Sequence, residues 1–126
     1  MISIHFILYV SNQEKSKFFY SKLLGIKPSL DVSGMTEFQL NTFTKLGLMP
    51  EKGISSILHN MPNPNLANGI PKCELYILVD DVEKYFEKAI LLGAKEINLP
   101  SLRDWGDCVG YVSDFDGNII AFAKKL

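Results

Sequence analysis

The chain has 126 residues, of which 47% are hydrophobic and 21% charged, an ordinary composition for a globular protein. Thirteen basic and fourteen acidic side chains leave a net charge of -1, so charge does not favour nucleic acid or an anionic membrane as a partner. No apolar run approaches the roughly 20 residues that cross a bilayer, and the start lacks the basic segment of a signal peptide. We therefore expect a cytoplasmic protein in which Cys73 and Cys108 are free thiols.

The first half of the chain predicts one strand, one helix and three further short strands. Residues 4–10 alternate with period two, which is typical of a half-buried strand. Ser11 or Asn12 can cap a helix that ends at Gly25. Strands are then expected at about 28–32, 35–40 and 44–49. The first strand places Phe6, Leu8 and Val10 on one face and His5, Ile7 and Tyr9 on the other.

The second half predicts the same order of elements. A strand at 73–79 precedes a helix that Asp81 caps and Gly93 ends. Strands at about 96–99, 107–112 and 118–124 follow, and a turn at 114–117 joins the last two. Between the halves, residues 51–72 are rich in proline, glycine and asparagine, which predicts a long loop with one helical turn at about 54–59.

The two halves also share their opening strand in sequence. The run from His5 to Val10 returns 69 residues later as the run from Glu74 to Val79. The chain therefore predicts an α+β fold of two βαβββ repeats, whose curved mixed sheets enclose a cleft and carry their helices outside. We expect a single domain over 1–126, with unit one at about 1–50, a connector at about 51–72 and unit two at about 73–126. His5 and Glu74 occupy equivalent strand positions, and we expect both to face that cleft.

These features resemble the vicinal oxygen chelate superfamily, which includes glyoxalase I, bleomycin resistance proteins and extradiol dioxygenases. The resemblance rests on the doubled unit, the opening strand, cap and helix of 5–25, and the closing Asp-x-Asp-Gly turn. In metal-containing members, the first and last strands of each unit supply one ligand each. Those positions align here with His5, Gly47, Glu74 and Ala121, so the resemblance implies a degenerate metal site.

The number of side chains that can act as ligands limits which metal cofactor the chain can hold. Tight zinc sites use three or four protein ligands, and iron or manganese sites use at least three. His5 and Glu74 fall short of that number, and Glu37 or His59 would have to supply a third. We expect either no cofactor or a weakly held zinc, nickel, iron or manganese ion.

Two interpretations of His5 and Glu74 remain open at this point. They can form a polar pair that anchors a ligand without chemistry, or Glu74 can act as a general base that His5 orients. Aromatic and cationic side chains are further candidates for ligand contacts, because a phenol, an indole or a guanidinium can bind polar or planar groups. The candidates are Tyr9, Tyr76, Arg103, Trp105 and Tyr111.

Two functions therefore compete. The first is a small-molecule binding protein of the bleomycin-resistance type with a degenerate metal site. The second is a metal-dependent lyase or isomerase of the glyoxalase I (lactoylglutathione lyase) type, or a related dioxygenase, that uses His5 and Glu74. In either case the partner is a small molecule, and relatives of this size imply a homodimer. The sequence leaves open the identity of the ligand and whether one chain or two close the cleft.

Overall fold

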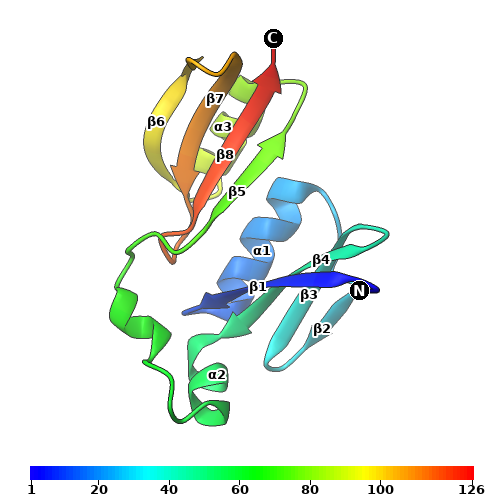
Figure 1. Ribbon diagram of the computed structural model, residues 1–126, viewed down its shortest axis with the longest axis vertical. Helices are drawn as coiled ribbons and strands as arrows, with labels where there is room; N and C mark the ends of the chain where they lie inside the picture. The colour runs from blue at the N-terminus through cyan, green and yellow to red at the C-terminus, as the bar shows by residue number, and fades with distance from the viewer. The chain divides into compact units, whose positions relative to one another are not determined.

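The computed structural model describes all 126 residues as two compact units, Met1–Ala67 and Asn68–Leu126. Each unit folds in the order β-α-β-β-β, and each forms a four-stranded mixed sheet. The α+β fold of two βαβββ repeats predicted from the sequence is thereby confirmed (Figure 1). No helix of the chain has the length and apolar character needed to cross a membrane.

Unit one is built on a sheet with strand order β1-β4-β3-β2, in which β1 and β4 are parallel and the other neighbours antiparallel. Its elements are β1 (Ile4–Val10), α1 (Gln13–Leu24), β2 (Leu30–Val32), β3 (Met35–Asn41), β4 (Thr44–Pro50), α2 (Glu51–Ile57) and the short 3-10 helix η1 (Pro64–Ala67).

Unit two repeats the arrangement with strand order β5-β8-β7-β6, and β5 is parallel to β8. Figure 1 shows α3 lying against one face of this sheet. Its elements are β5 (Glu74–Leu78), α3 (Val82–Leu91), β6 (Lys95–Leu102), β7 (Asp107–Ser113) and β8 (Ile119–Lys125).

Equivalent caps begin the long helix of each unit. Asn12 rather than Ser11 caps α1, and its Oδ1 accepts a hydrogen bond from the Lys15 amide at 3.0 Å. Asp81 caps α3 as predicted, accepting from the Lys84 amide at 3.1 Å. Each cap satisfies an amide that the first helical turn would otherwise leave unpaired. The same local chemistry therefore sets the start of both helices.

The core of each unit lies between its long helix and one face of its sheet. In unit one, Leu8 and Val10 are buried as predicted, together with Phe19 of α1. Phe6 alternates onto the same face, yet 52% of its surface is exposed. The reason is topological: β1 is an edge strand, and α1 packs over β4 and β3 instead.

Two sequence expectations need correction. The connector is more helical than predicted, because α2 begins directly after β4, at Glu51, and a 3-10 helix follows at Pro64. The sixth strand is also longer than the predicted 96–99 and runs through Pro100 to Leu102. A proline removes one donor from a strand, which an edge strand such as β6 tolerates.

Candidate functional site

Each sheet has one face that the helix of its own unit leaves uncovered, and we call this the open face. Side chains alternate between the faces of a strand, so every second residue belongs to it. On β1 the open face carries His5 and Tyr9, and on β5 it carries Glu74 and Tyr76. Most of the side chains that the sequence singled out therefore lie on the two open faces.

On the open face of unit one, His5, Glu37 and Lys45 form a charged cluster. His5 Nδ1 lies 3.7 Å from Glu37 Oε2, and Lys45 Nζ lies 3.3 Å from Glu37 Oε1. The Glu37 side chain is only 14% exposed, whereas that of His5 is 40% exposed. A carboxylate that is mostly buried needs such partners, because removing an unpaired charge from water is costly. Lys45 therefore acts as the counterion of Glu37.

Sequence reasoning named Glu37 only as a possible third ligand and missed Lys45. The antiparallel pairing of β3 and β4 places Glu37 beside Gly47, and the parallel pairing of β1 and β4 makes His5 the register partner of Lys45. That pairing joins residues forty positions apart in the chain. The available signal was the alternation of β4, which puts Lys45 two residues before Gly47 on the same face.

The donor set of the charged cluster does not fit a tightly held metal ion. It offers one imidazole and one carboxylate, fewer than the three or more protein ligands of zinc, iron or manganese sites. The Lys45 ammonium already neutralises that carboxylate. No three His, Cys, Asp or Glu side chains of the chain come together in a way that could hold a metal. His59, the other suggested third ligand, is exposed on the connector.

The two positions that lack a ligand side chain are tightly enclosed. A Cβ placed on Gly47 would lie 3.1 Å from Ile7 Cγ1 and 3.3 Å from the Met35 sulfur. Ala121 is fully buried, and its register partners on either side are Tyr76 and Tyr111. Ile7 and Met35 would therefore have to shift to admit a side chain at Gly47, and Tyr111 packs beside Ala121.

On the open face of unit two, five residues form an aromatic cluster: Tyr76, Arg103, Trp105, Asp107 and Tyr111. The Trp105 indole donates to the Tyr76 hydroxyl at 3.0 Å, and that hydroxyl donates to Asp107 Oδ2 at 2.6 Å. Trp105 remains 55% exposed and Tyr76 40% exposed. The hydrogen bonds orient the two rings while much of their surface stays open to solvent. Four of these five residues were predicted ligand contacts.

Arg103 holds the loop between β6 and β7 onto the same cluster. Its guanidinium lies over the Tyr111 ring, 5.1 Å from the ring centroid, which is a cation–π contact. It also donates to the Val109 carbonyl at 2.8 Å and to Asn98 Oδ1 at 2.7 Å. The guanidinium therefore turns towards the sheet.

The environment of Tyr76 limits its chemistry. Desolvation raises the pKa of the phenol, and its hydrogen bond to Asp107 raises the pKa further, above the ordinary value of 10.0. Tyr76 therefore stays neutral at physiological pH and can donate or accept hydrogen bonds. It is unsuited to act as a general base there.

The remaining candidates lie apart from these clusters. Tyr9 is half-buried at the end of β1, next to Met49 of β4. Glu74 is exposed at the start of β5, where its register partner is Ile119. His5 belongs to unit one and Glu74 to unit two, so the cleft expected to hold both stays a prediction.

The family can now be established by comparison. The model of the glyoxalase-like domain family matches residues 3–126. A search of curated proteins gives no match to the chain.

Solved structures resemble the fold closely at low sequence identity. A glyoxalase-related enzyme from Fulvimarina pelagi is 18% identical, with a TM-score of 0.82 over 99% of this chain and 88% of that one. The hypothetical protein SA1046 from S. aureus is 22% identical, with a TM-score of 0.81 over 98% and 94%. A glyoxalase/bleomycin resistance protein/dioxygenase family enzyme from Burkholderia phytofirmans PsJN is 17% identical, with a TM-score of 0.78 over 97% of each chain. The chain therefore belongs to the glyoxalase-like domain family, within the vicinal oxygen chelate superfamily.

Proposed function

We propose that this protein binds a small, planar organic molecule without a tightly held metal, in the manner of a bleomycin resistance protein. The observation that carries the proposal is the aromatic cluster of unit two. Trp105 and Tyr76 together present two partly exposed rings that are fixed by hydrogen bonds to each other and to Asp107. Rings held in place lose little conformational freedom on binding, which favours stacking on a planar ligand.

Polar groups beside the rings can select the ligand. Asp107 accepts from Tyr76 and still has acceptor capacity, because an ionised carboxylate can accept several hydrogen bonds. The Arg103 guanidinium donates to backbone carbonyls and lies over the Tyr111 ring. Arg103 therefore stabilises the aromatic cluster more than it contacts the ligand. A planar heteroaromatic compound with a hydrogen-bond donor at its edge fits this arrangement best.

The test uses Trp105, which is the only tryptophan of the chain, so its fluorescence reports on the cluster directly. Planar quinoline and acridine derivatives should quench this fluorescence and raise the melting temperature of the wild type. Trp105→Ala should weaken binding at least tenfold, measured by the thermal shift, because it removes the stacking surface. Phe43→Ala, which removes an exposed ring of unit one, should leave binding unchanged. Equal binding by Trp105→Ala and wild type would refute the proposal.

A metal-dependent lyase or isomerase is the second candidate, and one observation favours it. Glu37 places a carboxylate beside His5, so unit one offers two donors where only His5 matched the family pattern. Zinc or nickel added to the protein should then raise the melting temperature, and Glu37→Gln should abolish that rise. If neither metal changes the melting temperature, the lyase proposal fails. A role of Glu74 as base, a homodimer and a cytoplasmic location stay predictions.

A further inference from the structure

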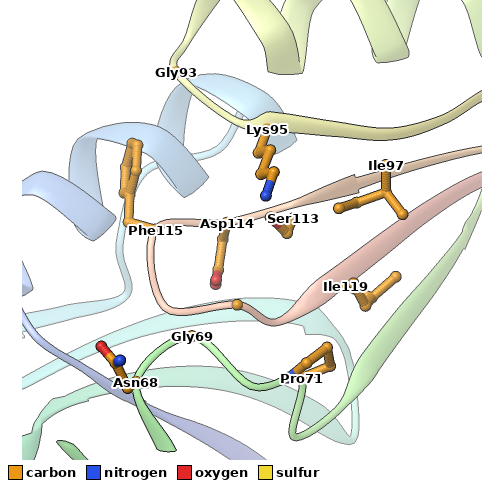
Figure 2. A pocket seen from close by; sticks show the side chains of 11 residues that line it. Asn68, Gly69, Pro71, Gly93, Lys95, Ile97, Ser113, Asp114, Phe115 and Ile119 are labelled. Atoms are coloured by element: carbon orange, nitrogen blue, oxygen red, sulfur yellow. The ribbon is translucent and has the colours of Figure 1, made fainter.

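Unit two contains a pocket of about 570 Å³ at one end of its sheet, and it shares no residue with the aromatic cluster. Its volume falls within the range of small-molecule sites, roughly 300–1,000 Å³. One wall is the sheet, through Ile97, Ser113 and Ile119. The other is the connector, through Asn68 and Pro71, and the turn between β7 and β8 closes the end (Figure 2).

The connector wall is held in place by a close backbone contact. A Cβ placed on Gly117 would lie 2.1 Å from the carbonyl oxygen of Gly69. Only a glycine at 117 allows the turn and the connector to approach so closely, and its φ of 84° also favours glycine. The pocket is therefore bounded by two segments that pack directly on each other.

The lining contains one ammonium group, that of Lys95, that an anion can pair with. Figure 2 shows the Lys95 side chain extending from β6 into the pocket. Lys95 is exposed and forms no ion pair with the protein. The one carboxylate in the lining, that of Asp114, accepts hydrogen bonds from the turn between β7 and β8. Its Oδ1 accepts from the amides of Asp116 and Asn118 at 2.9 Å, and its Oδ2 accepts from the Asn118 side chain at 3.0 Å.

The rest of the lining is largely apolar. Ile97 is 46% exposed on β6, and Ile119, Pro71 and Phe115 add further hydrocarbon surface. We propose that this pocket binds a small amphipathic anion, with Lys95 Nζ on the carboxylate and the isoleucines and proline on the apolar body. This site is separate from the aromatic cluster, and it does not depend on the function proposed for that cluster.

The experiment compares three probes that share a phenylpropyl body and differ in the head group and its charge: 4-phenylbutyrate, 4-phenylbutan-1-ol and 4-phenylbutylamine. Each is titrated into the ¹⁵N-labelled full chain, and amide shifts are followed by NMR. Phenylbutyrate should shift the amides of Ile97, Ser113 and Ile119, and the alcohol and the amine should bind at least tenfold more weakly. A charge-assisted hydrogen bond to the ammonium accounts for a difference of this size.

Two variants complete the test. Lys95→Met keeps most of the side-chain length and removes the charge, so phenylbutyrate should bind about tenfold more weakly to it. Lys124→Met is the matched control, because Lys124 is also exposed on unit two but lies outside the pocket. Absence of shifts at the pocket, equal affinity for acid and amine, or unchanged binding by Lys95→Met would each overturn the proposal. Trp105→Ala should bind phenylbutyrate like wild type, which separates this site from the function proposed above.

Discussion

The two units share one topology, yet their open faces differ in chemistry. In unit one, Glu37 is held between an imidazole and an ammonium, so the face is charged. In unit two, the equivalent surface is aromatic, with Trp105 and Tyr76 joined by a hydrogen bond. Helix caps and strand order are retained in both, whereas the exposed positions have diverged. A repeated scaffold therefore preserves what the core requires and leaves its uncovered face free to take up different functions.

The largest expected difference between the units lies in their last turns. In unit two, Asp114 is 6% exposed and accepts three hydrogen bonds within the turn between β7 and β8. In unit one, the side chain of Asn41 accepts from the Phe43 amide, and the residue is exposed. Asp114→Ala should lower the free energy of unfolding by about 3 kcal/mol, because it leaves buried donors unpaired. Asn41→Ala should lower it by less than about 1 kcal/mol. Urea unfolding measures both, and equal losses would contradict the comparison.

A smaller difference is expected at two strand glycines. A Cβ on Gly110 would lie 2.8 Å from Pro100 Cγ and 3.0 Å from Phe86, both packed on the helix side of unit two. Gly110→Ala should therefore lower the free energy of unfolding by about 1–3 kcal/mol through overpacking.

Gly47 is a strand glycine on the open face of unit one. Its new Cβ would meet Ile7 and Met35 at 3.1 and 3.3 Å, and the Ile7 side chain is 42% exposed and able to move. Gly47→Ala should thus cost less than about 1 kcal/mol. If denaturant unfolding shows Gly47→Ala to be the more damaging change, the open face is packed more rigidly than its exposure indicates.

The smallest effect concerns the pH dependence of unit two. The folded pKa of Tyr76 is raised, so at high pH the unfolded state loses its phenol proton before the folded state does. The contribution of the Tyr76 phenol to the free energy of unfolding is thus complete below pH 10.0, and it declines as pH rises further. The gap in melting temperature between wild type and Tyr76→Phe should therefore narrow as pH rises above 10.0. Tyr9→Phe, in unit one, is the control, and a gap that widens with pH would contradict the expected sign.

The sequence by itself determined the architecture. Period-two alternation, the caps Asn12 and Asp81, and the glycine at 25 fix the local structure, because each acts through neighbours within a few residues. The repetition of this order then specified two βαβββ units. The bounds of β6 and the helix at Glu51 could not be read in the same way. They depend on which strands become edges and on how the chain turns after β4.

The tertiary structure decided which side chains meet. Tyr76, Arg103, Trp105 and Tyr111 were recognised one by one, but only the pairing of β5, β7 and β8 places them in one cluster. The ion pair between Glu37 and Lys45 likewise depends on the register of β3 and β4, because a shift of one residue would turn Lys45 to the opposite face. Local patterns encode the elements, whereas contacts between distant strands, which local patterns do not contain, create the site.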